Sequence, residues 1–231
     1  MQTRVPTPKE ELTQAAIKGV VSAIPVVGGL ISELGACLVS PLDKRKRLWT
    51  DEVEAALAEL ASKYNRLPGA LAEDPAFVTA LLKATSAALA THEKLKLEAL
   101  RAFIVAVGSK ALSDEELQHA LVRLVGDLSV GHVEVLRFIE ADYEAVSTNV
   151  RLEEVFIRYN SEYRGKLDRM AFRWILSDLA ARMVVHLGDI EDMSEFASKR
   201  ESILRESSEI RPLQITGLGF RLLDLLKEKS A

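Results

Sequence analysis

Four histidines and one cysteine are the residues with which this chain could bind a metal ion or activate a nucleophile. His92, His119, His132 and His186 are too far apart for two of them to share a helix face at i, i+3 or i+4 spacing. We therefore expect no metal and no other cofactor. The surrounding pattern instead predicts that His132 begins a helix and that His186 belongs to a strand.

Nucleophilic catalysis has no recognisable signature either. Cys37 stands in "GACLV" on a largely apolar predicted helix, which is typical of an inert buried thiol. No serine has a G-x-S-x-G setting, and the glycines of "VVGG" lack the Lys-Ser/Thr of a phosphate-binding loop. We expect a protein that is not an enzyme.

The composition indicates a folded protein without a strong overall charge. Of 231 residues, 48% are apolar and 28% are charged, and the net charge is −4. Such a chain is not globally disordered, and its charge gives no general attraction to nucleic acid or to anionic membranes. The single cysteine suits a reducing compartment, and the polar start "MQTRVPTPKEELTQ" does not resemble a signal peptide. We expect a cytoplasmic protein of bacterial type.

Segments with helical periodicity follow one another from about residue 11, which predicts an N-terminal helical domain over residues 1–127. Apolar spacing on either side of Pro25 predicts a helical hairpin over about residues 12–42, and "SPLDKRKRLW" reads as a basic break after it. Asp74 and Pro75 predict the start of a helical region to about residue 107, as one helix or two abutting ones. "SDEE" at 113–116 matches a capping box and predicts one more helix.

Residues 128–231 have a different pattern, which predicts three helices, two strands and a last helix. The second and third helices are expected at about 152–159 and 166–183, and "MVVHL" and "PLQIT" are the expected strands. This order resembles a winged helix-turn-helix domain. In many such domains Thr-x-x-Gly joins the return strand to the last helix, and Thr216 and Gly219 have that spacing. The wing would be unusually long, about 25 residues.

The predicted fold class is therefore mainly α, with an N-terminal helical bundle followed by a winged-helix-like domain that carries a small β-hairpin. The whole chain also resembles a group of bacterial proteins of unknown function. The shared features are the "PVVGG" bend with a basic stretch after it, the helix "EKLKLEALRAF" and the winged-helix-like end. The family resembled is Abi-alpha, which its name links to abortive phage infection. The resemblance implies no catalytic residues.

The third helix of the predicted winged-helix-like domain is the element that would read a DNA groove. Lys166, Arg169 and Arg173 are expected on one side of it, away from the apolar stripe. Residues 151–231 nevertheless contain fourteen basic and fourteen acidic residues, whereas a dedicated DNA binder usually has a basic excess. Docking of a protein partner or self-association is therefore favoured, nucleic-acid binding remains an alternative, and a merely solvated face would also fit.

The apolar hairpin raises the question of membrane contact. Only 14 uncharged residues separate Lys18 from Glu33, and a spanning helix needs about 20 apolar residues. Contact with a membrane surface stays open, as does burial in the bundle. The residues that would contact a membrane or a partner are Leu30, Ile31, Leu34, Lys44, Arg45, Lys46 and Arg47.

We therefore expect a non-enzymatic interaction or regulatory protein whose winged-helix-like domain docks another protein. Two alternatives remain open. The chain could be a DNA-binding regulator that acts through the 166–183 helix, or a peripheral membrane-associated effector that acts through the 12–42 hairpin. A role in phage defence is what the family resemblance implies.

Overall fold

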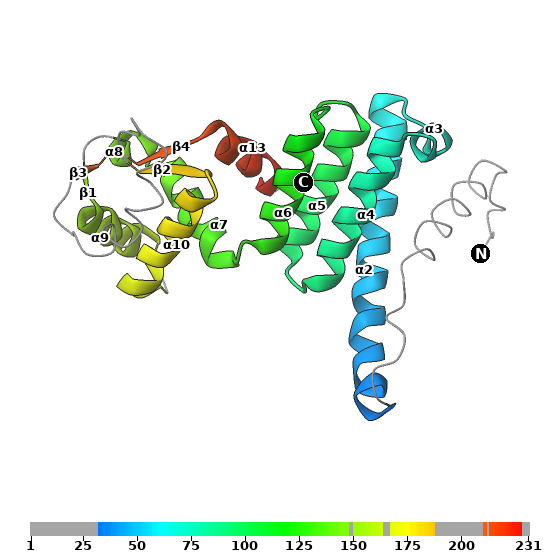
Figure 1. Ribbon diagram of the computed structural model, residues 1–231, viewed down its shortest axis with the longest axis horizontal. Coiled ribbons are helices and arrows are strands. Elements are labelled where there is room, and N and C mark those ends of the chain that lie inside the picture. Colours follow the sequence, from blue (N-terminus) through cyan, green and yellow to red (C-terminus); the bar gives the residue numbers. More distant parts are fainter. Residues whose placement is uncertain (1–31, 148–149, 164–166, 188–209, 212, 228–231) are drawn as a thin grey trace, which may run out of the picture. The chain divides into compact units, whose positions relative to one another are not determined.

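A computed structural model of the chain describes residues 32–147, 150–163, 167–187, 210–211 and 213–227 (Figure 1). The chain divides into two compact units, residues 1–126 with 228–231, and residues 127–227. Most described residues are helical, and the described strands are short and belong to the second unit. The predicted mainly α fold is confirmed.

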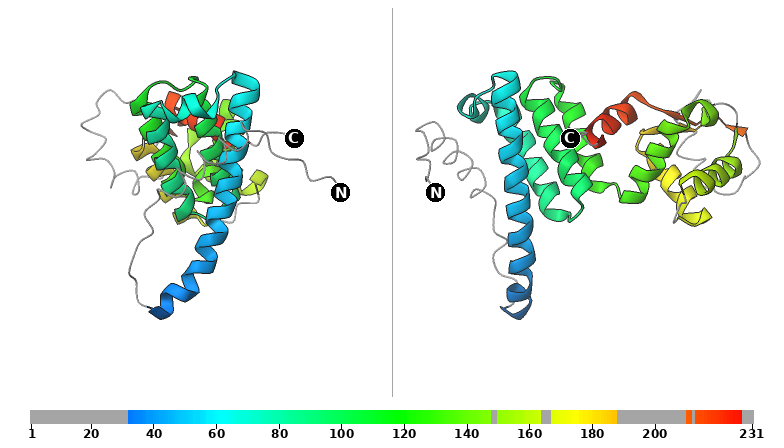
Figure 2. Two further views of the ribbon diagram at one scale, coloured as in Figure 1. Left: turned by 90° about the vertical axis from the view of Figure 1, so that its right-hand side faces the viewer. Right: turned by 180° about the vertical axis from the view of Figure 1, so that it is seen from behind.

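The first unit is a helical bundle, as predicted. Figures 1 and 2 show α4, α5 and α6 side by side, with the long helix α2 along one edge. Helix α2 packs against both α4 and α5. The helices are α2 (Ser32–Tyr64), α3 (Pro68–Ala72), α4 (Pro75–Ala90), α5 (Lys94–Gly108) and α6 (Glu115–Asp127).

Helix α2 runs without interruption through the segment that was expected to be a basic break, so that prediction is wrong. Lysine and arginine are good helix formers, and their polarity alone does not end a helix. Directly after them, Trp49 is 1% exposed and donates from Nε1 to Thr85 Oγ1 of α4 at 3.0 Å. Val53, Leu57 and Leu60 continue this buried stripe. Packing on α4 therefore holds the segment in the helix.

The region from residue 75 to residue 108 forms two helices and not one. Thr91 separates α4 from α5 in an extended conformation (φ −113°, ψ 158°), and its Oγ1 accepts from Glu93 N at 3.2 Å. At the other end of α5, a Cβ on Gly108 would lie 2.6 Å from Leu60 Cδ1. The absence of a side chain at Gly108 lets α5 approach α2 closely.

Asp74 begins α4, as predicted, and also carries charge-charge contacts. Its Oδ1 accepts from Ala76 N at 3.1 Å and from Phe77 N at 3.4 Å. Its Oδ2 lies 3.6 Å from Arg66 and pairs with the Lys110 ammonium. The hydrogen bond from Lys110 is the main reason why the pKa of Asp74 lies below its ordinary value of 3.8, and burial opposes the shift.

We expect Asp74→Ala to lower the free energy of unfolding at neutral pH by about 1–2 kcal/mol, because the helix loses its cap. Asp74→Asn keeps an acceptor and loses only the charge, so its loss should be smaller. A carboxylate with a depressed folded pKa stabilises above its unfolded pKa and loses that effect as the pH falls through the folded value. Urea unfolding across a pH series should therefore show wild type and Asp74→Asn converging in acid. A constant difference down to about pH 2 would contradict a role for the charge.

The second unit has the winged-helix order of elements. Its helices and strands are α7 (Val130–Ala141), α8 (Tyr143–Val146), β1 (Val150–Arg151), α9 (Leu152–Tyr163), α10 (Arg169–Ala181), β2 (Val185–Leu187), β3 (Ile210–Arg211), β4 (Leu213–Ile215) and α13 (Gly217–Leu226). His186 lies on β2, as predicted. The residues expected to form the wing, 188–209, lie outside the described residues.

Strand pairing supports the winged-helix-like topology. β1 pairs antiparallel with β3, with Val150 opposite Arg211, and β2 pairs antiparallel with β4, with Val185 opposite Ile215. Only residue 212 separates β3 from β4. This stretch thus pairs with β1 over its first part and with β2 over its second. Strand β1 was not predicted, because two residues are too few to show alternation.

Aromatic side chains from three helices form the centre of this unit. Tyr159 of α9 lies 5.4 Å from Phe138 of α7 and 5.1 Å from Phe172 of α10, measured between ring centroids. All three are almost completely buried. Burial, with a smaller contribution from Glu134, raises the pKa of the Tyr159 hydroxyl. The cluster joins the three helices into one core.

Candidate interaction face on the third helix

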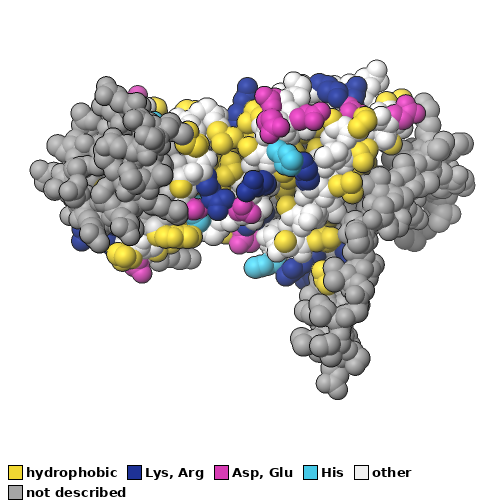
Figure 3. Space-filling model, viewed as in Figure 1, with side chains coloured by type: hydrophobic (Ala, Val, Ile, Leu, Met, Phe, Trp, Pro, Cys, Tyr) yellow, Lys and Arg dark blue, Asp and Glu magenta, His cyan; other side chains and the backbone are white. Residues whose placement is uncertain are grey.

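Helix α10 presents two large apolar side chains to solvent. Met170 is 70% exposed and Trp174 is 60% exposed, and their i, i+4 spacing places them on one face. Figure 3 shows hydrophobic side chains gathered over this helix. An exposed tryptophan beside an exposed methionine is unusual on a protein surface and is typical of an interaction site.

The opposite face of α10 fixes this orientation. Phe172, Ile175, Leu176 and Leu179 are buried at helical spacing, so residues 170 and 174 must point away from the core. The helix begins after Asp168, whose side chain accepts from Ala171 N at 2.7 Å. The exposed face is therefore held by a capped, well-packed helix.

The predicted basic side of the helix is only partly present. Helix α10 begins at Arg169, three residues later than expected, and Lys166 lies outside the described residues. Arg169 pairs with Glu153 of α9, which compensates its charge. Arg173 is half-buried, and within the described part of the chain it has no ion pair. The structure thus brings Arg169 and Arg173 onto α10, and of the two only Arg169 has an ion pair with a described residue.

A cluster of polar residues lies underneath Trp174. The Ser129 hydroxyl and the Ser129 backbone N–H both donate to His132 Nδ1, at 2.7 and 3.2 Å. His132 Nε2 therefore carries the ring proton, and it lies 3.2 Å from Asp178 Oδ2. The His132 ring meets the Trp174 ring edge-on, with centroids 5.4 Å apart. His132 is 3% exposed and begins α7, as predicted from the sequence.

The residue types of this cluster are those of a Ser-His-Asp hydrolase triad, but each member already has a structural partner. Ser129 is the N-cap of α7, where it forms a capping box with His132. Asp178 also accepts from Arg182 Nε at 2.7 Å, and Arg182 reaches Asp127 at 3.1 Å. The hydrogen bond to Asp178 is the main reason why the pKa of Arg182 is raised. The contacts tie α7 to α10 and support the Trp174 ring from below.

The residues expected to contact a membrane are only partly described. Leu30 and Ile31 lie outside the described residues, as do residues 12–29 of the hairpin, and Leu34 lies in the first turns of α2. Lys44 and Arg47 are exposed on α2, Lys46 is half-buried, and Arg45 donates to Leu89 O at 3.2 Å. Within the ranges that the structure describes, no helix combines the length and the apolar composition needed to cross a bilayer.

The other candidates for chemistry are dispersed. Cys37 lies in α2, and His92 is exposed in the link between α4 and α5. Among the described residues, no three His, Cys, Asp or Glu side chains are grouped so that they could hold a metal ion. Met170 and Trp174 were not predicted as contact residues. Their signal was present, because both fall outside the buried stripe of the third helix.

The fold and the exposed face define the class of this protein. It is a mainly α protein with a helical bundle and a winged-helix-like unit, and its third helix exposes an apolar face. Comparison with protein-family models found no match. Comparisons with curated proteins and with solved structures found no significant match either. The resemblance to the Abi-alpha family stays a prediction.

Proposed function

We propose that this protein is a non-enzymatic interaction protein and that its winged-helix-like unit docks a protein partner through α10. The observation that carries the proposal is the exposure of Trp174 and Met170 on one face of that helix. Tryptophan and methionine are enriched at protein interfaces, and tryptophan is among the residues that contribute most to binding energy there. A regulatory role, in phage defence or another process, rests on the family resemblance alone.

The charges beside this face indicate the chemistry of the partner. Arg173 follows Met170 by three positions and is half-buried, its Nη2 is buried without a hydrogen-bond partner, and it has no ion pair among the described residues. The part of this guanidinium that reaches the surface next to Trp174 favours a carboxylate at the edge of the interface. The partner surface that fits is an apolar patch bordered by Asp or Glu side chains.

DNA binding is less well supported than protein docking. The Glu153 carboxylate neutralises Arg169, and phosphate contacts depend on uncompensated basic side chains. A groove-reading helix would also bring the apolar surface of Met170 and Trp174 against a charged backbone. DNA binding is therefore an outcome that the experiment must distinguish from protein docking.

The test compares the full chain with Trp174→Ala and with Met170→Glu, which brings a like charge toward the partner's carboxylates. Leu67→Ala is the matched control, because Leu67 is 54% exposed in the first unit. We expect either change on α10 to weaken binding of a captured and purified partner by about 30-fold, the effect of removing about 2 kcal/mol at an interface centre. Leu67→Ala should bind as wild type does, and circular dichroism should show that all variants are folded.

Two further measurements test whether a second copy of the chain or DNA binds this face of α10. Sedimentation velocity of the full chain would detect a dimer, and its loss in Trp174→Ala would identify a second copy as the protein partner. Fluorescence anisotropy with random duplex DNA at low salt would detect nucleic-acid binding. DNA binding that Arg169→Ala plus Arg173→Ala weakens, and that Trp174→Ala leaves unchanged, would overturn the proposal. Equal partner binding by all variants would do so too.

A further inference from the structure

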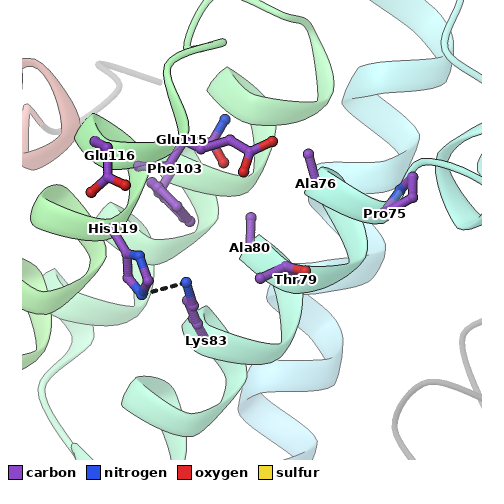
Figure 4. Close-up of a pocket in the computed structure, with 10 residues that line it drawn as sticks. Pro75, Ala76, Thr79, Ala80, Lys83, Phe103, Glu115, Glu116 and His119 are labelled. Carbon is purple, nitrogen blue, oxygen red and sulfur yellow. Dashed lines mark hydrogen bonds between the residues drawn. The ribbon is translucent and has the colours of Figure 1, made fainter.

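A pocket of about 380 Å³ opens between α4 and α6 in the first unit (Figure 4). Its volume lies within the range of small-molecule sites. Phe103 of α5 and Ala80 of α4 are almost completely buried and form part of its wall. The residues that line it are Pro75, Ala76, Thr79, Ala80, Lys83, Phe103, Glu115, Glu116, Gln118 and His119.

Small side chains on α4 explain why the space is open. Ala76, Thr79 and Ala80 follow one another on the face of α4 that borders the pocket, and none of them reaches α6. The Phe103 ring belongs to the packed core and cannot swing out to fill the gap without leaving a void behind it. The pocket is therefore built into the bundle.

Opposite charges stand at the two ends of this pocket. At one end the Lys83 ammonium donates to His119 Nε2 and joins α4 to α6. At the other end Glu115 and Glu116 lie in the first turn of α6, where the helix dipole favours carboxylates. Figure 4 shows Glu115 well separated from the Lys83–His119 pair. Glu115 and His119 are four residues apart, so their backbone positions are separated by about 6 Å along the axis of α6.

We propose that this pocket binds a small zwitterion with widely separated charges, an ω-amino carboxylate. The Lys83 ammonium donates one hydrogen bond to His119, and its two other N–H groups can donate to the carboxylate of the ligand. Glu115 accepts from the ammonium group of the ligand, and the alkyl chain lies along Ala76 and Thr79 of α4, which line the pocket and are not buried. This site is independent of the docking face on α10.

The same charges disfavour simpler ligands. A phosphate at Lys83 would face the carboxylates of Glu115 and Glu116, and an alkylamine would leave the Lys83 ammonium without a counter-charge. An α-amino acid carries both charges next to one carbon, so it satisfies one end of the pocket and leaves the other without a counter-charge. An ω-amino carboxylate satisfies both ends at once.

The test is a titration of the ¹⁵N-labelled full chain, followed by amide NMR shifts, with four probes of one carbon skeleton. 5-Aminopentanoate has the proposed charge separation, and 2-aminopentanoate is its isomer with adjacent charges. Pentanoate and pentylamine each carry one of the two charges. We expect 5-aminopentanoate to shift amides of α4 and α6 with a Kd on the order of 1 mM. Each of the other three probes should bind at least about tenfold more weakly.

Lys83→Met and Glu115→Gln should each reduce binding of 5-aminopentanoate by about tenfold or more, because one charged hydrogen bond is lost. Lys94→Met and Glu54→Gln, at exposed positions that do not line the pocket, are the matched controls and should bind normally. Amide spectra of each variant report that the bundle is folded. The proposal is overturned if no probe shifts α4 and α6 amides at about 10 mM, or if pentanoate or 2-aminopentanoate binds as tightly as 5-aminopentanoate.

Discussion

Gly219→Ala should unfold the second unit, whereas Gly217→Ala, two residues earlier on the same helix, should leave it intact. A Cβ on Gly219 would lie 2.2 Å from the carbonyl oxygen of Val184 and 2.7 Å from Ile215 Cγ2. A Cβ on Gly217 would meet nothing within 4 Å. The two positions therefore separate the effect of steric overlap from that of replacing a glycine in a helix.

The overlap at Gly219 cannot be relieved by a side-chain rotation. Val184 O belongs to the backbone next to β2, and it accepts from Thr216 N at 3.1 Å. Thr216 in turn caps α13, because its Oγ1 accepts from Gly219 N at 3.0 Å. A methyl group at position 219 must move α13 away from the β2–β4 pair and break this joint. We expect a loss of about 3 kcal/mol or more, and in Gly217→Ala a change between zero and a gain of about 1 kcal/mol.

Hydrogen-exchange mass spectrometry of the full chain is the measurement that resolves this effect by segment. In Gly219→Ala the amides of α7, α10 and α13 should exchange much faster than in wild type, while those of α4 and α5 keep their protection. Uniform loss of protection over both units would show that the two units do not unfold separately. Protection of α13 equal to that in wild type would show that the joint tolerates a side chain.

Much of the winged-helix-like unit could be predicted from the sequence, because its elements are separated by strong local signals. Thr216 and Gly219 lie at the spacing that caps a helix behind a strand, and the structure forms that cap. The helix between Asp168 and Arg182 shows a regular apolar stripe, and the same stripe implies that position 174 is exposed. These features depend on residues close together in sequence, where patterns are informative.

Features that depend on contacts between distant residues were missed or misplaced. The basic segment before Trp49 is helical because Trp49 packs on Thr85, 36 residues later, which no local pattern shows. The cap of α6 is Asp114, which accepts from Leu117 N at 2.9 Å, and not Ser113 of the matching box.

The candidate sites also differ in whether they depend on local sequence or on contacts between distant residues. The exposure of Trp174 could be predicted from the sequence, because helical periodicity alone places it outside the core. The Lys83–His119 pair joins residues 36 positions apart on two helices that pack on either side of α5, so the pocket needs the tertiary structure. The contact between His132 and Asp178 likewise needs the packing of α7 on α10.

Trp49→Ala should produce the largest loss of stability in the first unit. Removal of a fully buried tryptophan typically costs about 3–5 kcal/mol, because the packing is lost and a cavity remains. The Thr85 hydroxyl also loses its donor, although it still donates to Leu81 O at 2.7 Å. Trp49→Phe keeps most of the ring volume and loses the hydrogen bond, so about 1–2 kcal/mol is expected. Leu48→Ala is the matched control at a neighbouring position that is 47% exposed, with a change within about 0.5 kcal/mol.

Urea unfolding followed by circular dichroism should rank the three variants in that order, and hydrogen exchange should place the loss in α2, α4 and α5.

The ranking also bears on the basic residues of α2. Lys44, Arg45, Lys46 and Arg47 lie within the two turns that precede Trp49, so its burial fixes how they are presented. If Trp49→Ala is as stable as Leu48→Ala, the packing of Trp49 on α4 does not hold this segment. If the large loss is found, the basic residues act from a rigid helix, and any partner or anionic surface must fit Lys44 and Arg47 as α2 places them.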